Sequence, residues 1–401
     1  MDFGFWIRLA GSFRQSKIQK LKSKIMTCRR LMYIMSEQKL ERDRFENRAA
    51  IDKILVRATN WLGDAVMTLP ALGQLRRTFP DSFICLMSQP SLASFFQASR
   101  LVDEILIYRR KERGWPEFLS ALHRIRQTKF DLAVLFQGSF EAALIARLAG
   151  IPIRVGYAVQ SRSWLLTHPI AKPELSTPRH QTLDYAQIVD VALNAFGRNN
   201  DHPPLDQHSH LVPVITPTTA QREAGTRLLR EHDVLTSEHP IAMLNAGATN
   251  SRAKRWPVDR YAGLADALTT SFGARIVFLG TPAEREIAER VIQAMKVPNA
   301  VNLAGLTDIP TLVGLLSHAD LVIGNDTGSA HVAAALGRPT LTIFGPTNEF
   351  ETAPSGQRSE IVRADGIECA RCMFRDCPID HRCMIRISTS ELVERARPFL
   401  T

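Results

Sequence analysis

Short apolar runs that alternate with segments of helical spacing are the feature that most constrains the fold of this chain. Each run has the length of a buried strand, and the segments between runs repeat their apolar residues with helical periodicity. Strands that alternate with helices predict an α/β fold with a mainly parallel sheet, covered on both faces. Up to residue 157 the predicted strands are 53–57, 82–88, 104–108, 131–136 and 153–157, and the predicted helices are 64–79 and 141–150.

The alternation stops and then restarts. Between about residues 199 and 240 the chain is rich in Pro, His and polar residues, which is typical of a connection between domains, and a helix is predicted at 217–231. Two Rossmann-like halves with a cleft between them are therefore expected, with ligands beyond the carboxyl ends of the strands. In the second half the predicted strands are 241–245, 274–280, 320–326 and 339–345, and the predicted helices are 259–273, 282–295, 329–337 and 389–400.

Composition and charge exclude several classes of protein. The 401 residues suggest two or three domains, and no apolar run approaches the roughly 20 residues of a membrane span. The net charge is +10, but residues 1–34 hold eight basic residues and one acid, which leaves only +3 for the rest. The body is therefore not expected to bind nucleic acid.

The basic segment 1–50 is interpreted as a disordered leader or as the result of a start site assigned too early. The second reading is suggested by Met35, from which the sequence looks like a natural N-terminus. Such a tail could also touch an anionic membrane surface. It does not read as a signal peptide, since Arg8 interrupts its apolar start and basic residues follow.

Several catalytic fingerprints are missing. No G-x-G-x-x-G follows a predicted strand and no G-x-x-x-x-G-K-[ST] is present, which disfavours a dinucleotide dehydrogenase and a P-loop NTPase. The G-x-S-x-G elbow and the H-E-x-x-H zinc motif are also absent.

The loop after the first predicted strand, "RATNWLGDAVMTLPAL", places Asp64 where a helix begins. An acid at this position often only caps the helix. The alternative is a carboxylate at the lip of the cleft that acts as a general base, with Gly63 letting the backbone turn tightly and a substrate approach.

Two later loops suit a phosphate. "LNAGATNSRAKRWP" supplies Thr249 and Lys254 after a strand, and "GNDTGSAHVAAALGRPTLTIFGPT" supplies a turn at a helix start. Amides and cations at such places bind anions, so the two loops together fit a diphosphate, and Glu284 could accept from ribose hydroxyls. The alternatives are a solvated basic loop, a plain helix cap and a buried histidine. The residues of the turn are Asp326, Thr327, Gly328 and His331.

These three segments, with "LFQGSFEAALIARLAGIPIRVGY" at 135–157, resemble the signature regions of the bacterial ADP-heptose:lipopolysaccharide heptosyltransferases, glycosyltransferase family nine. The similarity runs along residues 51–400 and is greatest to members that add a heptose to a first heptose. It implies a GT-B fold of two facing Rossmann-like domains. The expected parts are an acceptor-side domain at 51–215, a donor-binding domain at 216–388 that includes the cysteine cluster, and a closing helix at 389–401.

The resemblance also implies inverting transfer of L-glycero-D-manno-heptose from ADP-heptose to the inner core of lipopolysaccharide, onto Kdo or heptose. Asp64 matches the catalytic base, and Thr249 and Lys254 match residues that hold the donor diphosphate. Asp326, Thr327, Gly328 and His331 match the donor-binding turn. No cofactor is expected for the transfer itself, in keeping with the missing D-x-D motif. The chain departs from the family pattern at Glu141, where members often carry Lys.

Four cysteines cluster late in the chain with the spacing C-x2-C-x4-C-x5-C. Without a secretory signal a disulfide framework is not expected. Four thiolates could instead hold a structural zinc ion or an iron–sulfur cluster, although the spacing matches neither standard pattern closely. The alternative is a set of free or redox-active thiols. The cysteines are Cys369, Cys372, Cys377 and Cys383.

Other functions stay open at this point. A related GT-B enzyme could use another nucleotide sugar, a nucleotide-sugar epimerase would need no acceptor, and a non-catalytic sugar-nucleotide-binding or membrane-surface module would not depend on Asp64. The leading expectation is a monomeric cytoplasmic enzyme at the inner face of the cytoplasmic membrane, where a lipid A-core acceptor is embedded.

Overall fold

The computed structural model describes residues 51–172, 179–195, 211–235 and 238–401. Asp52–Thr401 form one compact unit. The predicted basic leader 1–50 and part of the predicted connection, residues 199–210 and 236–237, lie outside the described residues. Within the described part, no helix is both long and apolar enough to cross a membrane.

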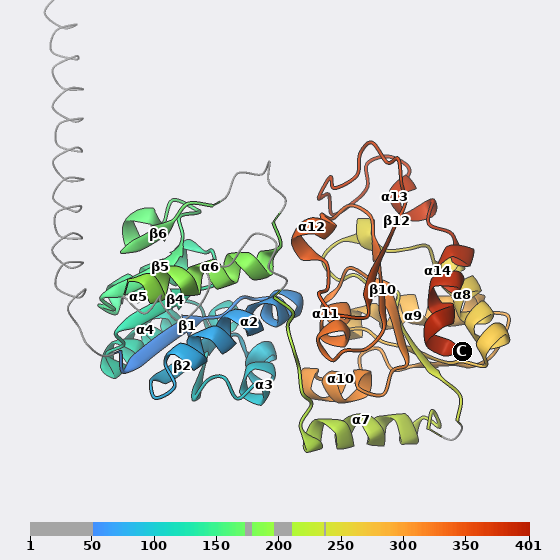
Figure 1. The fold of residues 1–401 in the computed structure, drawn as a ribbon, viewed down its shortest axis with the longest axis horizontal. Coiled ribbons are helices and arrows are strands. Elements are labelled where there is room, and N and C mark those ends of the chain that lie inside the picture. The colour runs from blue at the N-terminus through green and yellow to red at the C-terminus, as the bar shows by residue number, and fades with distance from the viewer. Residues whose placement is uncertain (1–50, 173–178, 196–210, 236–237) are drawn as a thin grey trace, which may run out of the picture. The chain divides into compact units, whose positions relative to one another are not determined.

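The first half of the unit is a six-stranded parallel sheet with helices around it (Figure 1). The order of the strands across the sheet differs from their order along the chain, because β1 lies between β2 and β4. In sheet order the strands are β3 (Glu104–Ile107), β2 (Phe83–Ser88), β1 (Lys53–Arg57), β4 (Leu132–Leu135), β5 (Ile153–Tyr157) and β6 (His168–Ile170). The helices are α2 (Leu62–Thr78), α3 (Pro90–Ala98), α4 (Arg110–Thr128), α5 (Phe140–Leu148) and α6 (Gln181–Asn194).

The second half repeats this plan with a second six-stranded parallel sheet, in which β7 lies between β10 and β8. In sheet order its strands are β12 (Ser359–Arg363), β11 (Thr340–Phe344), β10 (Leu321–Asn325), β7 (Ile241–Asn245), β8 (Arg275–Phe278) and β9 (Ala300–Asn302). Its helices are α7 (Thr219–Glu231), α8 (Val258–Phe272), α9 (Arg285–Ala294), α10 (Ile309–Leu316), α11 (Gly328–Ala335), α12 (Glu349–Thr352), α13 (Arg382–Ile385) and α14 (Thr389–Leu400).

The central strands are buried along their whole length. β7, β10 and β11 have no exposed residue, as expected of parallel strands covered by helices on both faces. The closing helix α14 packs on α8 and buries Leu392, Ala396 and Leu400 in the core around the second sheet (Figure 1). It is therefore part of the layer that covers this sheet.

Helices α7 and α10 cross at two glycines. A Cβ atom at Gly314 would lie 1.7 Å from the carbonyl oxygen of Gln221, and one at Gly225 would lie 2.3 Å from the carbonyl carbon of Gly314. Only glycine fits such a close crossing. The Thr218–Gln221 capping box fixes where α7 begins.

The predicted strands are confirmed to within two residues at their ends, and several further elements escaped prediction. The predicted helix 282–295 is a short 3-10 turn, Pro282–Glu284, followed by α9. Helix α4 has a break at Gly114, which adopts φ 62° and ψ −142°, next to Pro116. The unpredicted strands β6, β9 and β12 all lie at or beside sheet edges.

Candidate active site

Asp64 lies in the first turn of α2, just after β1. The N-cap of α2 is Trp61, so Asp64 does not cap the helix. Its side chain is half-buried. Burial and, to a smaller extent, the negative charge of Asp326 raise the pKa of the Asp64 carboxyl to about 6, while Lys254 opposes this shift. A carboxylate with a pKa near neutrality can take a proton at physiological pH and release it again.

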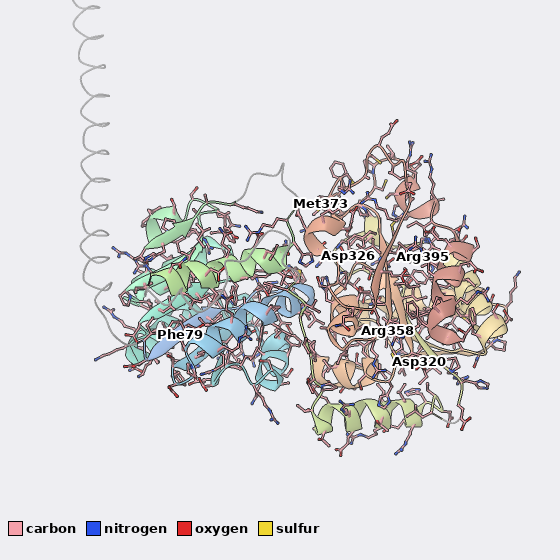
Figure 2. The ribbon with its side chains drawn as sticks, in the orientation of Figure 1. Phe79, Asp320, Asp326, Arg358, Met373 and Arg395 are labelled. Carbon is pink, nitrogen blue, oxygen red and sulfur yellow. The ribbon has the colours of Figure 1, made fainter. Side chains whose placement is uncertain are left out.

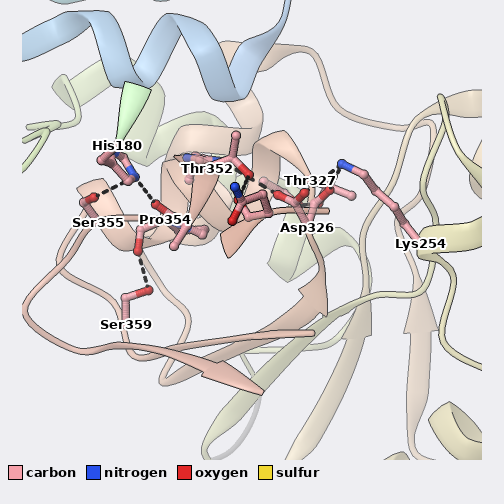
Figure 3. Close-up of polar contacts among 12 residues, drawn as sticks. His180, Lys254, Asp326, Thr327, Thr352, Pro354, Ser355 and Ser359 are labelled. Carbon is pink, nitrogen blue, oxygen red and sulfur yellow. Dashed lines mark hydrogen bonds and ion pairs between the residues drawn. The ribbon is translucent and has the colours of Figure 1, made fainter. Parts of the chain in front are cut away.

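Lys254 and Asp326 form an ion pair between the two predicted phosphate loops. The Lys254 Nζ atom donates to Asp326 Oδ2 at 2.7 Å and lies 3.3 Å from the Asp326 carbonyl oxygen (Figure 3). Lys254 ends a 3-10 turn after β7, and the buried Asp326 directly follows β10 (Figure 2). Because β7 and β10 are neighbours in the sheet, two loops that are far apart in sequence meet here.

Helix α11 begins at the predicted turn, but Asp326 is not its cap. The N-cap is Thr327, whose side chain makes no capping hydrogen bond. The Thr327 hydroxyl instead lies 3.0 Å from the Ser329 hydroxyl. Gly328 is required by a close approach, since a Cβ atom there would lie 2.8 Å from Cβ of Leu62 in α2.

His331 is a buried residue of α11, only 5% exposed. Burial lowers the pKa of His331 to about 4, although Asp326 opposes this shift, so the ring is neutral at physiological pH. Its Nε2 atom lies 4.0 Å from Asp326 Oδ1. A Cβ atom at Gly63 would lie 2.9 Å from the His331 ring. Gly63 is therefore needed for this contact rather than for a left-handed turn, and His331 braces the residue next to Asp64.

Thr249 and Glu284 also come together beside the loop after β7. The Thr249 hydroxyl donates to Glu284 Oε1 at 3.0 Å, and the Thr281 amide donates to Glu284 Oε2 at 2.8 Å. A Cβ atom at Gly247 would lie 2.3 Å from the Glu284 carboxyl carbon. The loop can therefore lie against this buried carboxylate only because residue 247 is glycine.

Two buried asparagines that the sequence reading missed hold the loops in place. Asn245 ends β7 and donates to the Ser329 hydroxyl at 2.9 Å, while Asn325 ends β10 and donates to the Gly247 carbonyl at 2.9 Å. The Oδ1 atom of Asn325 accepts from the Trp256 amide at 3.1 Å. The sequence feature that could have identified them is an asparagine at the end of each of two apolar strands.

His180 is a further residue that sequence reasoning missed. It is the N-cap of α6, and its Nδ1 atom accepts from the Thr182 amide at 3.3 Å. Its Nε2 atom lies 2.8 Å from the carbonyl oxygen of Ala353 and 3.4 Å from the Ser355 hydroxyl (Figure 3). His180 thus connects α6 to the segment after α12.

The four clustered cysteines lie in the segment 369–383, beside the loop of Lys254. Burial, together with the other three cysteines of the cluster, raises the pKa of the Cys383 thiol to about 11. Among the described residues, however, no group of three or more potential ligands is arranged to hold a metal ion. The His381 ring is engaged by the Ala253 carbonyl at 2.6 Å. The metal therefore stays a prediction.

The chain is similar to known proteins both in sequence and in structure. Residues 118–382 match the family model described as glycosyltransferase family 9 (heptosyltransferase). The chain is 30% identical over 329 residues to lipooligosaccharide heptosyltransferase 2 of Haemophilus ducreyi, covering 78% of this chain and 88% of that protein. It is 28% identical over 317 residues to the Haemophilus influenzae protein of the same name, covering 77% and 88%.

Among solved structures, the chain is similar to ADP-heptose lipopolysaccharide heptosyltransferase II of Escherichia coli. The TM-score is 0.71 at 25% identity, covering 87% of this chain and 98% of that one. The expected GT-B fold is confirmed, and so is the resemblance drawn from the three segments. The chain belongs to glycosyltransferase family 9, the family of the heptosyltransferases.

Proposed function

We propose that this glycosyltransferase moves a heptose from ADP-heptose to the inner core of lipopolysaccharide. The observation that carries the proposal is the half-buried Asp64, whose pKa of about 6 reflects its burial and the nearby charge of Asp326. The names of the relatives support the donor and acceptor classes, since those from Salmonella typhimurium and Escherichia coli are called lipopolysaccharide heptosyltransferase 2.

In the proposed reaction, Asp64 removes the proton from an acceptor hydroxyl. The hydroxyl oxygen forms a bond to the anomeric carbon of the heptose, and the bond from that carbon to the diphosphate oxygen breaks. ADP leaves with the electron pair, and the proton stays on the Asp64 carboxylate until water takes it. A single displacement of this kind inverts the anomeric configuration, so one base on the protein is sufficient.

The loops at the ends of β7 and β10 would bind the donor. Lys254 and the first amides of α11 would stabilise charge on the leaving diphosphate, since helix N-termini and cations favour anions. With donor bound, the Thr249 hydroxyl would turn from Glu284 Oε1 and donate to the same group, and Glu284 would accept from ribose hydroxyls. Asp326 would orient Lys254 through their ion pair.

The acceptor would bind to the first half of the unit, at about residues 51–215, and the donor to residues 216–388. Because lipopolysaccharide is anchored in a membrane, we expect the protein to act at the inner face of the cytoplasmic membrane. We also expect it to act as a monomer. Peripheral contact with that surface would bring the sugar acceptor to Asp64.

The cysteine segment would support the donor loop. The Ala253 amide donates to the Arg375 carbonyl at 2.9 Å, and Arg252 pairs with Asp376 at 2.6 Å, so the segment contacts the loop that carries Lys254. We propose that Cys369, Cys372, Cys377 and Cys383 close on a structural metal ion, zinc or iron.

Metal analysis of the purified protein tests this second point. We expect about one bound metal ion per chain and its loss in Cys372→Ser, together with a raised KM for the donor. A metal-free wild-type protein with the same donor KM as the variant would contradict it. Cys85→Ser is the matched control, because Cys85 lies in β2 and outside the cluster.

A donor panel tests the main proposal. ADP-heptose, UDP-sugars and GDP-sugars are each incubated with a heptose-deficient core, and release of the nucleoside diphosphate is measured with and without acceptor. We expect release from ADP-heptose that depends on the acceptor. A preference for another nucleotide would overturn the donor assignment, and conversion of the sugar without an acceptor would indicate an epimerase.

A further inference from the structure

The tryptophans of this chain differ in what surrounds their rings. Three of the four that the structure describes have an aromatic neighbour: Trp115 and Trp164 lie beside phenylalanines, and Trp256 has its ring centre 5.0 Å from that of Tyr261. The fourth, Trp61, is 55% exposed. Among the described residues its indole has no aromatic, cationic or hydrogen-bond partner. The ring of Trp61 is therefore open to a ligand.

The side chain of Trp61 does not cap the helix that it precedes. Trp61 is the N-cap of α2, and its side chain makes no capping hydrogen bond. Ser, Thr, Asp and Asn are the residues that stabilise a helix from this position, because their side chains accept from the first backbone amides. Capping therefore gives no reason for a tryptophan here, and neither does core packing, since the ring is exposed.

Trp61 stands three residues before Asp64, so the two occupy the N-cap and N3 positions of α2. The Ala65 amide donates to the Trp61 carbonyl at 2.9 Å, which shows that the first helical turn spans both residues. Side chains at the N-cap and N3 positions of a helix can reach one another, as they do in a capping box. The exposed indole and the carboxyl of the proposed base therefore start from the same side of the helix entry.

The backbone that carries Trp61 is held on both sides. Before it, the Gln89 side-chain amide donates to the Asn60 carbonyl at 2.5 Å. After it, Leu62 lies against the turn before α11, since a Cβ atom at Gly328 would lie 2.8 Å from the Cβ of Leu62. A ring on a backbone that is already ordered loses less conformational freedom when a ligand binds to it.

The face of an indole ring suits one face of a pyranose sugar. The indole face carries negative charge density, whereas the C–H groups on one side of a pyranose are apolar and slightly positive. Stacking removes both surfaces from water and leaves the hydroxyls around the edge of the sugar free to reach a neighbouring carboxylate. The indole N–H can in addition donate to one of these hydroxyls.

The place of Trp61 in the fold favours the acceptor sugar over the donor. Trp61 follows the carboxyl end of β1 in the first sheet, whereas the proposed donor loops follow β7 and β10 in the second. We propose that the Trp61 indole stacks on the pyranose ring of the acceptor and so determines which of its hydroxyls faces Asp64. The proposal rests on the proposed function, because it takes the first half of the unit as the acceptor side.

Kinetics with a soluble acceptor test the proposal. KM and kcat are measured for wild type, Trp61→Ala and Trp61→Phe with ADP-heptose and a deacylated, heptose-deficient core. We expect Trp61→Ala to raise the acceptor KM about tenfold, as for loss of one stacked ring, with the donor KM and Tm unchanged. Trp61→Phe should stay within about threefold of wild type, because a flat aromatic face remains. An unchanged acceptor KM in Trp61→Ala would overturn the proposal, and so would a raised donor KM in its place, which would assign the ring to the nucleobase.

Leu148→Ala is the matched control. Leu148 is also a large apolar residue with an exposed side chain, 47% exposed. It ends α5 shortly before β5 begins, so it lies at the opposite edge of the sheet from the proposed site. Its replacement should leave the KM values for acceptor and donor unchanged.

Acceptor binding without donor separates this proposal from the proposed function. Indole fluorescence is followed as the deacylated core is added to wild type, Trp61→Phe and Leu148→Ala, and binding is measured in parallel by calorimetry. We expect a fluorescence change in wild type and Leu148→Ala that is absent in Trp61→Phe, although Trp61→Phe still binds the core. This result would support the stacking even if ADP-heptose were not the donor. A change that persists in Trp61→Phe would overturn the stacking alone, and a wild type that does not bind the core would overturn the acceptor assignment with it.

Discussion

Asp64 shows how a few neighbouring charges set the behaviour of one residue. Its carboxyl is desolvated by burial and lies near the negative Asp326, while Lys254 partly compensates. Lys254 is itself paired with Asp326 at 2.7 Å. The proton affinity of the proposed base on one half of the unit therefore depends on a pair carried by the other half.

The pH dependence of kcat/KM follows from this arrangement. Since the base must be ionised, activity should fall as the pH drops through about 6, the pKa of Asp64. Asp326→Asn removes a negative charge and frees Lys254, and both changes lower the pKa of Asp64. The acidic limb of the profile should therefore move to lower pH, whatever happens to the maximum rate. An unchanged or upward-shifted limb would show that Asp326 does not act on the base.

At this scale the sequence predicted where the polar residues lie but not how they pair. Asp64, Lys254 and Asp326 each follow an apolar strand, which made them recognisable. That Lys254 meets Asp326, and that Asn325 ties down the 246–247 backbone, depends on β7 and β10 being neighbours. The order of strands across a sheet cannot be predicted from the spacing of apolar residues along the chain.

Some helices and strands are easier to predict from the sequence than others. Buried strands such as β7 and β10 read directly as apolar runs. Helix α10, with the sequence "IPTLVGLL", is apolar on nearly all sides and lacks the polar face that makes a helix recognisable. Helix α4 was missed because Gly114 and Pro116 interrupt its first turns. Edge strands such as β6 are too short to give a pattern.

Two glycines inside helices, one at a close helix contact and one in ordinary contact, give a matched pair of variants whose stabilities can be predicted. Gly314→Ala places a Cβ atom 1.7 Å from the Gln221 carbonyl oxygen, so α7 and α10 must separate. We expect it to lower the free energy of unfolding by about 3 kcal/mol, as for overpacking of a close contact.

Gly263→Ala in α8 is the control, since its nearest neighbour would be 3.8 Å away, in ordinary contact. Removing a glycine from a helix interior should stabilise the protein by about 0.5–1 kcal/mol. Urea unfolding of both variants measures the two effects. Equal stabilities would mean that the α7–α10 crossing is looser than described.

The whole unit repeats one plan twice, and the two copies serve different substrates in our proposal. In each sheet the first strand along the chain lies in the middle, with β1 between β2 and β4 and β7 between β10 and β8. In both sheets, polar loops follow the carboxyl ends of the strands. The first sheet supplies Asp64, and the second supplies Lys254 and the turn before α11.

A variant at the proposed diphosphate site of the second half should therefore weaken donor binding and leave acceptor binding nearly unchanged. Lys254→Ala removes a cation from the proposed diphosphate site, and we expect about a tenfold or greater rise in the dissociation constant for ADP. The KM for acceptor should stay nearly unchanged. Lys296→Ala, outside these loops, is the control. A Lys254→Ala protein that binds ADP normally would remove Lys254 from the donor site.

The central claim is that Asp64 is the base of an acceptor-dependent transfer from ADP-heptose. The most direct test is the turnover of Asp64→Asn with ADP-heptose and a heptose-deficient core, alongside its affinity for ADP. We predict a loss of about 10²–10⁴-fold in kcat with ADP affinity nearly unchanged. An Asp64→Asn protein that turns over at the wild-type rate would contradict the claim.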